Sequence, residues 1–363
     1  MTGTGNALQD RRAFLAVGAG CLSLAAFDLP AMAAEQGRQD EPEHRSLKLP
    51  SGRSMGYRTI GQGDTDLILV HGFPGSSRQF LSFEKFLTNS GLCALAPDLY
   101  GKKTDWQQRG SVLDAGEDIA DLYLQVRGKE RRPVVLCVSA GAKDGIAATI
   151  ALNLKLQGKY VPALYVISGQ MDLGRADTFG LLRADQQFEF NCIRGVSRRA
   201  VLRVIQPVRN LGANIRRSVA HRRVDRLSHD PEAAFRRIVG AMSITEDIPL
   251  LREDPEFRSN LRKEIAEYTG GEIIHSIHRL FNWDVDFRQL RGTPVTIVHG
   301  TKDSMVPHQN AEILRRELQR AGVEAVVKLY PDGHLLLKRR AEAIAANIKE
   351  GLRATDVGPF QDR

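Results

Sequence analysis

The feature that most constrains the fold is a regular alternation of short apolar runs with helical stretches between residues 53 and 352. The apolar runs 66–70, 134–138 and 163–167 have the length and composition of strands buried on both faces. Stretches with helical spacing separate most of the apolar runs. Strands that alternate with helices in this way form a mostly parallel sheet with helices on its faces. We therefore expect an α/β fold with a mostly parallel central sheet.

The same patterns place the individual elements along the chain. Strands are expected at 53–59, 66–70, 92–96, 134–138, 163–167, 294–298 and 325–329. Helices are expected at 77–88, 112–126, 146–152, 310–321 and 339–352.

Between residues 170 and 291 the pattern changes. Strand-like runs disappear, and four prolines interrupt a helical, arginine-rich segment. Because predicted sheet strands lie on both sides of it, we interpret residues 171–291 as an inserted helical cap. The core is then formed by residues 45–170 and 292–356.

Residues 1–34 predict an export signal. Arg11 and Arg12 form a twin-arginine pair, a weakly hydrophobic stretch covers 16–27, and Ala31-Met32-Ala33 is a small-x-small cleavage pattern. The segment resembles a bacterial Tat signal peptide cleaved after Ala33. This implies the Tat translocase as a partner during export and a periplasmic location. An uncleaved signal that tethers the chain to the membrane is the alternative.

The cysteines indicate buried thiols and no disulfide framework. A Tat substrate folds in the reducing cytoplasm before export, where disulfides are rare. Cys93 and Cys137 lie in strand-like apolar runs, which is typical of buried free cysteines.

Ser139 is the candidate nucleophile because it stands between the apolar run 134–138 and a helical stretch. Cys137 and Gly141, two residues before and two after it, are small enough for strand and helix to approach closely. A turn this tight holds the serine hydroxyl clear of the sheet, and the helix N-terminus adds N–H groups and a positive dipole end. The alternative is an ordinary strand followed by a helix, with Ser139 as the helix cap.

Two further polar residues, Asp303 and His334, follow the last two predicted strands. The carboxyl ends of parallel strands meet at one edge of a sheet. Ser139, Asp303 and His334 therefore converge there, in the chain order serine, aspartate, histidine. Such a histidine takes the proton of the serine hydroxyl, and the carboxylate orients the imidazole. Asp172, just after the strand at 163–167, is the alternative acid.

A candidate oxyanion hole follows the strand at 66–70. The run His71-Gly72-Phe73-Pro74-Gly75 contains flexible glycines. The N–H groups of Phe73 and Ala140 are the expected donors to a developing negative oxygen, and loss of one such donor costs about 3 kcal/mol. We interpret His71, with Gly72 and Gly141, as a structural support of the motif. A plain Pro-Gly turn is the alternative for this segment.

Together these motifs resemble the α/β-hydrolase superfamily, specifically the capped branch that includes esterases, proline iminopeptidases and carbon–carbon bond hydrolases. The resemblance spans roughly residues 45–170 and 293–352. It implies Ser139 as nucleophile, Asp303 as acid, His334 as base and Phe73 with Ala140 as oxyanion donors, without a metal or other cofactor. A serine nucleophile argues against the dehalogenase and epoxide hydrolase branches, which use aspartate. The matching segments are 69–75, 96–101, 138–141, 298–303 with 306–307, and 333–334.

The chain departs from the family pattern at three places. Cys137 replaces the first glycine of the Gly-x-Ser-x-Gly motif and adds bulk at a crowded turn. Val138 replaces the histidine or other polar residue that often precedes the serine. After Gly101, the run Lys102-Lys103-Thr104-Asp105 replaces the usual Gly-His-Gly-x-Ser pattern.

The predicted cap is basic between residues 194 and 226, a stretch that contains ten arginines and one acidic residue, Asp225. One interpretation is solvated helix faces that pair with acids elsewhere, such as Glu232, Glu246 and Asp247. The other is a surface for anionic membrane lipids or a negatively charged substrate. No nucleic acid partner is expected, because this stretch has no aromatic residue that could stack on bases.

Other cap residues predict packing. His275 and His278 are three residues apart, a spacing that can hold a metal, but no carboxylate-histidine motif accompanies them and we interpret them as packing residues. Phe281, Trp283 and Phe287 are expected to pack the cap onto the core and to line an acyl pocket.

The predicted function is hydrolysis of a carboxylic ester or lactone of modest size by a serine hydrolase. Peptide, amide, thioester and carbon–carbon bond cleavage stay open, because the cap decides specificity. A catalytically idle member that binds a ligand is the alternative from another class. The net charge of +8 is mildly basic and by itself implies no nucleic acid partner.

Overall fold

The computed structural model describes most of the core and parts of the segment 171–291. The described residues are 42–73, 75–100, 103–184, 186–187, 190–191, 247–257, 259–260, 275–276, 278–281 and 283–355. The predicted signal and the basic stretch 194–226 lie outside them.

In this part of the chain, eight strands form one sheet in the order β1-β2-β4-β3-β5-β6-β7-β8. β2 pairs antiparallel with both β1 and β4, and every other pairing is parallel. The predicted mostly parallel sheet is thus confirmed. The strands are β1 (Arg45–Lys48), β2 (Ser54–Ile60), β3 (Thr65–Val70), β4 (Leu92–Pro97), β5 (Val134–Val138), β6 (Ala163–Ile167), β7 (Val295–Gly300) and β8 (Ala325–Tyr330).

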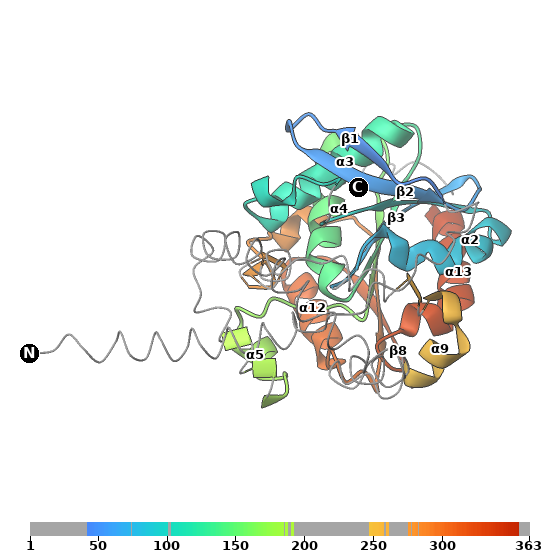
Figure 1. The fold of residues 1–363 in the computed structure, drawn as a ribbon. Helices are drawn as coiled ribbons and strands as arrows, with labels where there is room; N and C mark the ends of the chain where they lie inside the picture. The colour runs from blue at the N-terminus through green and yellow to red at the C-terminus, as the bar shows by residue number, and fades with distance from the viewer. Residues whose placement is uncertain are drawn as a thin grey trace, which may run out of the picture.

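Helices cover both faces of the sheet (Figure 1). One face packs against α3 (Val112–Arg127), α4 (Ala142–Leu156) and α12 (Gln309–Arg320). The other face packs against α2 (Glu84–Asn89) and α13 (Leu336–Thr355). The other described helices are the short α5 (Ala176–Phe179) and α9 (Ile248–Glu253), with 3-10 turns η1 (Ser77–Phe83), η2 (Trp106–Gln108), η3 (Ser139–Gly141) and η5 (Phe287–Leu290).

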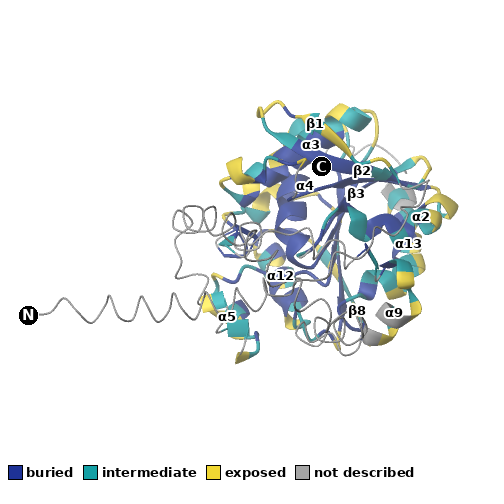
Figure 2. Cartoon of the chain, in the orientation of Figure 1, coloured by how far each residue is buried: buried dark blue, intermediate teal, exposed yellow. Residues whose placement is uncertain are grey.

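The central strand β5 shows why the sheet is buried. Val135 and Cys137 point toward the α3–α4–α12 face, whereas Val134, Leu136 and Val138 point toward the α2–α13 face. This is the period of two that a strand imposes on its side chains. All five residues are buried. β5 is the fifth of the eight strands in the sheet order, so its end lies in the middle of the sheet, and the strands in the centre of the molecule are mostly buried (Figure 2).

The predicted elements match the structure in order and type, but several bounds differ. The helix expected at 146–152 is longer at both ends, since α4 spans Ala142–Leu156. The helix expected at 77–88 is a 3-10 turn followed by α2, and the helix expected at 339–352 begins earlier, at Leu336. β1 was not predicted, because its four residues are exposed or half-buried and carry no apolar alternation.

The segment 171–291 is described only in part. Its described pieces contain α5, α9 and η5, and no strand. Trp283 from this segment joins the main core of the sheet domain, and Phe287 packs against that core, as predicted for both. Within the described residues, no helix is both long and apolar enough to span a membrane.

Candidate active site

Ser139 lies at the turn between β5 and α4, at the carboxyl edge of the sheet. Its φ is +53°, a left-handed conformation that is uncommon for serine. The neighbouring glycines are required by space. A Cβ at Gly141 would lie 2.3 Å from the carbonyl oxygen of His71, and a Cβ at Gly72 would lie 2.9 Å from the Cβ of Ser139. The strained turn is therefore held tightly between the loop after β3 and the start of α4.

Cys137, which replaces the usual first glycine of the motif, is accommodated by a glycine in the helix that it faces. A Cβ at Gly145 in α4 would lie 2.4 Å from the Cβ of Cys137 and 2.8 Å from its Sγ. The missing side chain at Gly145 therefore makes room for the side chain at Cys137. Burial raises the pKa of the Cys137 thiol, so this cysteine stays protonated and unreactive.

Asp303 and His334 come together at the ends of β7 and β8. The Nδ1 of His334 lies 2.8 Å from Oδ2 of Asp303. Oδ1 of Asp303 accepts the backbone N–H groups of Met305 and Val306, each at 2.9 Å. Because the ionised carboxylate can only accept, the proton of a neutral imidazole sits on Nδ1 and leaves Nε2 free to take another.

The electrostatics of this pair favour an ionised carboxylate. Burial alone would raise the pKa of Asp303, but attraction to His334 and a contact with His299 outweigh burial and lower it well below its ordinary value. Nε2 of His299 is 3.3 Å from Oδ2 of Asp303. Burial alone would lower the pKa of His334, but the Asp303 carboxylate outweighs it and raises that pKa.

Asp172 lies elsewhere. Its Oδ1 accepts the backbone N–H of Gly174 at 2.7 Å, and its Oδ2 accepts that of Trp283 at 3.2 Å. Of the two acids named from the sequence, Asp303 is the one whose carboxylate contacts His334.

Within the described residues the structure joins His334 to Asp303 but gives no hydrogen bond between His334 and the Ser139 hydroxyl. All three residues are nearly buried, with exposed fractions of 7%, 7% and 8% for Ser139, Asp303 and His334. Hydrogen bonds of this kind often tighten only when substrate binds.

His71 organises the loop that carries Gly72 and Phe73. It is fully buried, its Nε2 accepts the N–H of Leu99 at 3.0 Å, and its Nδ1 lies 2.7 Å from the carbonyl oxygen of Gly72. Burial lowers the pKa of His71, so the ring is neutral and donates from Nδ1. Both ring nitrogens are thus used in holding backbone, which fits the structural role expected for this histidine.

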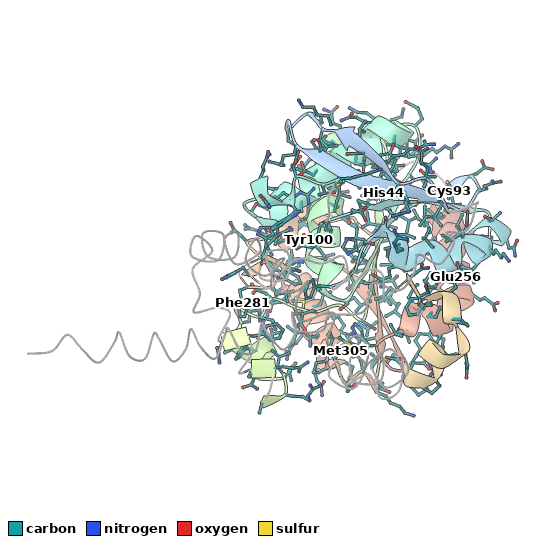
Figure 3. The ribbon with its side chains drawn as sticks, viewed as in Figure 1. His44, Cys93, Tyr100, Glu256, Phe281 and Met305 are labelled. Atoms are coloured by element: carbon teal, nitrogen blue, oxygen red, sulfur yellow. The ribbon has the colours of Figure 1, made fainter. Side chains whose placement is uncertain are left out.

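The expected oxyanion donors, Phe73 and Ala140, lie in the same apolar cluster. Ala140 belongs to the first turn of the helix, where backbone N–H groups have no acceptor within the helix. The other members come from the segment 171–291, and the ring centroid of Phe281 lies 6.3 Å from that of Phe179 in α5. Figure 3 labels Phe281. The cluster contains Phe73, Ala140, Leu173, Phe179, Leu182, Phe190, Leu280 and Phe281.

A buried ionic network contacts the turn that carries Ser139. Nζ of Lys143 donates to the carbonyl oxygen of Ala140 at 2.8 Å and lies 2.7 Å from Oδ2 of Asp144. Oδ1 of Asp144 accepts from Nη2 of Arg279, a residue of the segment 171–291. Burial alone would raise the pKa of Asp144, but the two cations lower it, so the carboxylate is ionised and paired.

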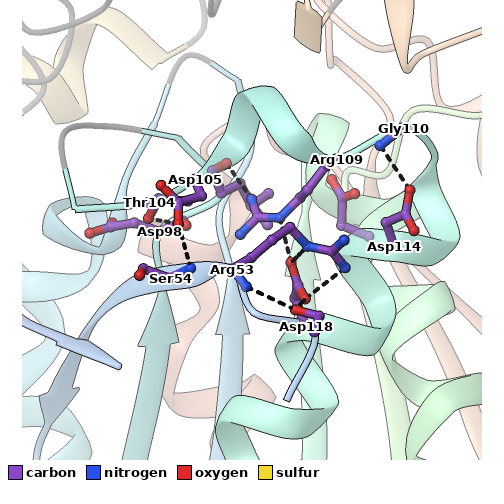
Figure 4. Close-up of polar contacts among 12 residues, drawn as sticks. Arg53, Ser54, Asp98, Thr104, Asp105, Arg109, Gly110, Asp114 and Asp118 are labelled. Atoms are coloured by element: carbon purple, nitrogen blue, oxygen red, sulfur yellow. Dashed lines mark hydrogen bonds and ion pairs between the residues drawn. The ribbon is translucent and has the colours of Figure 1, made fainter. Parts of the chain in front are cut away.

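A second network fixes the loop after β4 (Figure 4). Arg109 and Arg53 both donate to Asp118, at 2.8 Å and 2.9 Å, and Arg109 also donates to the carbonyl oxygen of Leu99 at 2.7 Å. Because His71 accepts the N–H of the same Leu99, this network and the Phe73 loop meet at one residue.

His275 packs as predicted. Its ring centroid lies 5.3 Å from that of Trp106 and 6.2 Å from that of Tyr100, both in the core. In the part of the chain that the structure describes, no group of three histidine, cysteine, aspartate or glutamate residues could hold a metal ion.

Asp247 is a residue of the site that the sequence analysis missed. It was named there only as a partner for arginines of the basic stretch. The structure places its Oδ2 against the backbone N–H groups of His334 and Leu335, at 2.7 Å and 3.1 Å. No local motif marks Asp247. The glycine at position 333 is the only sequence signal of such a close approach, because a Cβ there would lie 2.6 Å from Oδ1 of Asp247.

Comparisons with known proteins agree with this fold. The sequence pattern of the alpha/beta hydrolase family matches residues 67–347. No curated protein sequence matches the chain. Among solved structures, an esterase from Exiguobacterium antarcticum is 14% identical with a TM-score of 0.56, covering 86% of this chain and 100% of its own.

Two further structures are similar at the same level. The esterase RhEst1 from Rhodococcus sp. ECU1013 is 18% identical, with a TM-score of 0.55 and coverage of 85% of this chain and 98% of its own. A bromoperoxidase from Bacillus anthracis is 14% identical, with a TM-score of 0.55 and coverage of 86% and 100%. Because these proteins are named for different activities, this likeness shows the fold alone, and the activity must be argued from the site.

Proposed function

The chain belongs to the alpha/beta hydrolase family, and on that premise we propose that it is a serine hydrolase that forms an acyl-enzyme on Ser139. The observation that carries the proposal is the His334–Asp303 pair at 2.8 Å, at the same sheet edge as a serine held at positive φ. Such an arrangement is what nucleophilic catalysis by a serine requires.

In the proposed reaction, Nε2 of His334 takes the hydroxyl proton as Oγ of Ser139 bonds to the substrate carbonyl carbon. Asp303 stabilises the imidazolium through Nδ1. The N–H groups of Phe73 and Ala140 bind the negative oxygen of the tetrahedral intermediate. The carbon–oxygen bond to the leaving alcohol then breaks, and the alcohol takes the proton from His334.

Water completes the cycle in the same way. His334 takes a proton from a water molecule, and the hydroxide formed attacks the acyl carbon. Collapse of the second tetrahedral intermediate releases the acid, and Oγ of Ser139 recovers its proton from His334. Apart from substrate and water, every group used in these steps belongs to the chain.

The proposed substrate is a carboxylic ester or lactone with an apolar acyl part. Support comes from the apolar cluster that includes both expected oxyanion donors, because an acyl chain bound against it would leave water. Two of the structural neighbours are esterases, although identities of 14% and 18% to this chain show only the fold.

Location is part of the same proposal. The twin-arginine signal at residues 1–34 supports export by the Tat translocase to the periplasm. Replacing Arg11 and Arg12 together by lysine should then retain the protein in the cytoplasmic fraction. Unchanged appearance in the periplasmic fraction would contradict this route.

Labelling with a fluorophosphonate probe tests the proposed chemistry. The wild-type protein should be labelled and Ser139→Ala should not. Ser168→Ala is a matched control, because Ser168 follows β6, also has a positive φ of +47°, and is fully buried. This control should keep the label. A folded wild-type protein that stays unlabelled would contradict the proposal.

Screening then narrows the substrate. Acyl esters of graded chain length, lactones and aminoacyl amides should be compared as substrates of unlabelled protein, taken from a preparation that the probe has shown to be reactive. We expect turnover of esters or lactones, and turnover of the amides alone would contradict the ester assignment.

A further inference from the structure

Asp247 lies beside His334 but has no role in the proposed mechanism. It belongs to the segment 171–291. It lies 87 residues before His334 in the chain. Only 1% of Asp247 is exposed. Its Oδ2 accepts the N–H of His334 at 2.7 Å and that of Leu335 at 3.1 Å, just before the first residue of α13. Unpaired N–H groups at a helix N-terminus favour a carboxylate, so this contact is stabilising on both counts.

A second contact anchors the short helix that follows Asp247. α9 is flanked by Asp247 at its N-terminus and Asp254 at its C-terminus. Asp254 lies 2.6 Å from Nζ of Lys338 in α13, and the Lys338 ammonium is also 5.6 Å from the ring centre of Phe257. Both ends of α9 therefore contact the beginning of α13, and the Asp247 end is the one that lies beside His334.

The other oxygen of Asp247 shows that the contact is more than a helix cap. Oδ1 is buried and has no hydrogen-bond partner among the described residues. A side chain at position 333 would collide with it, since a Cβ on Gly333 would lie 2.6 Å away. Burying a carboxylate oxygen without a hydrogen-bond partner costs free energy. Such a group in a folded protein calls for an explanation, such as a functional role.

We propose that Asp247 is a positioning residue of the active site, which fixes the backbone of His334 and adds a second negative charge beside its imidazolium. The inference rests on the proposed function, because it assigns His334 as the base. It makes the base depend on the segment 171–291, whereas the acid, Asp303, comes from the core.

The charges around His334 support this assignment. Oδ2 of Asp303 lies 2.8 Å from its Nδ1, and the charge of the Asp247 carboxylate also raises the pKa of the same ring. Oδ2 of Asp303 also lies 3.3 Å from Nε2 of His299. The remaining acid of this loop, Asp332, is paired with Arg340 at 2.7 Å.

The pKa of Asp247 also reflects a site that holds more than one carboxylate. Burial raises the pKa of Asp247, opposed by the N–H of Leu335, the charge of His334 and the N–H of His334, while the charge of Asp303 raises it further. Removing its charge should therefore lower the pKa of His334, because one of the two carboxylates that favour the imidazolium is lost.

Two substitutions separate the charge from the hydrogen bonds. Asp247→Asn removes the charge and keeps an oxygen that can accept both N–H groups. Asp247→Ala removes both. Asp254→Asn is the matched control, because it weakens the other anchor of the same helix without touching His334.

The first measurement is the NMR titration of the His334 imidazole, assigned by comparison with His334→Gln. In Asp247→Asn we expect the pKa of His334 to fall by about half a unit or more. Asp254→Asn should leave this pKa unchanged. An unchanged pKa in Asp247→Asn, or an equal fall in Asp254→Asn, would overturn the assignment.

The second measurement is the rate of fluorophosphonate labelling of Ser139 as a function of pH. The acid limb should shift to lower pH in Asp247→Asn, and the plateau should fall roughly ten-fold or more in Asp247→Ala because the base is less well positioned. A plateau within about two-fold of wild type in folded Asp247→Ala would overturn the positioning role. If the wild-type protein is not labelled at all, the proposed function fails, while the titration of His334 still tests Asp247.

Discussion

The two halves of the candidate site are built in different ways. The nucleophile half comes from one continuous stretch, β5 and the first turns of α4, in which Cys137, Ser139 and Gly145 already fix the geometry. The base half joins three separate segments. The imidazole of His334 contacts Asp303, 31 residues earlier, and the backbone N–H of His334 donates to Asp247, 87 residues earlier. The nucleophile is thus positioned locally, whereas the base depends on contacts that form only in the folded chain.

The segment 171–291 reaches both halves through charged groups. Arg279 pairs with Asp144 below the nucleophile turn, and Asp247 holds the backbone of His334. The difference lies in what each contact controls. Arg279 supports a helix that is otherwise well packed, whereas Asp247 contacts the proposed base itself.

The largest expected effect distinguishes the two acids named from the sequence. Asp303→Asn should lower kcat by roughly 10⁴-fold, because an amide oriented toward Nδ1 favours the wrong imidazole tautomer. Asp172→Asn should change kcat by less than about three-fold, since its oxygens accept backbone N–H groups away from His334. Steady-state ester hydrolysis measures both. Equal losses, or a larger loss at Asp172, would show that the acid has been misassigned.

Removing the buried guanidinium of Arg279 tests the contact below the nucleophile. Arg279→Met leaves Asp144 with one cation in a fully buried position, so the free energy of unfolding should fall by about 3–5 kcal/mol. Arg288→Met removes a solvent-exposed pair with Asp286 and should change it by less than about 1 kcal/mol. Urea unfolding of the two variants provides the comparison, and similar losses would show that the buried pair contributes no more than a surface pair.

The pairing of Cys137 with Gly145 predicts a smaller effect. Gly145→Ala should destabilise the protein by about 1–3 kcal/mol, because overpacking against Cys137 outweighs the gain of up to about 1 kcal/mol in helix propensity. The double variant Cys137→Gly/Gly145→Ala should recover most of this loss. Thermal or urea unfolding of the single and double variants measures the coupling. Additive losses would mean that the two positions do not compensate each other.

The smallest expected effect is a shift in pH dependence. Hydrolysis requires neutral His334, and its pKa is raised by Asp303 over the opposing effect of burial. The acid limb of kcat/KM should therefore lie above the ordinary histidine value of about 6.5, and activity should rise as pH increases through it. In Asp303→Asn the limb should move to lower pH. An acid limb at or below the ordinary value in the wild-type protein would contradict the arrangement.

The same shift sets the direction of the linked stability. A raised pKa of His334 in the folded state adds stability that is fully present below the unfolded pKa and is lost as pH rises through the folded pKa. The lowered pKa of Asp303 acts in the other direction, since its contribution is present above the unfolded pKa and is lost as pH falls through the folded pKa.

The nucleophile half and the base half of the site also differ in how they could be predicted from the sequence. The strand 134–138 and the turn at Ser139 were predictable because apolar runs and small flanking residues are local signals. Asp303 and His334 were predictable from strand order, since parallel strands end at one edge. Their pairing required only that β7 and β8 be neighbours, which the structure has.

Asp247 and β1 were beyond such reasoning for different physical reasons. The contact of Asp247 with His334 is made to backbone N–H groups, which carry no residue identity, across a segment with no strand pattern. β1 is an edge strand whose residues are exposed or half-buried, so no apolar alternation marks it. Gly145 did offer a readable signal, because glycine inside a helix is unfavourable unless a neighbour needs the space.

The most direct test of the account is to trap the covalent intermediate. The protein is mixed briefly with an activated ester such as p-nitrophenyl acetate, quenched in acid, digested and mapped by mass spectrometry. We predict an acetyl group on the peptide that contains Ser139, absent from Ser139→Ala and strongly reduced in His334→Ala, with none on Ser168. Ester turnover by the wild-type protein without an adduct on Ser139, or with the adduct on another residue, would contradict the account.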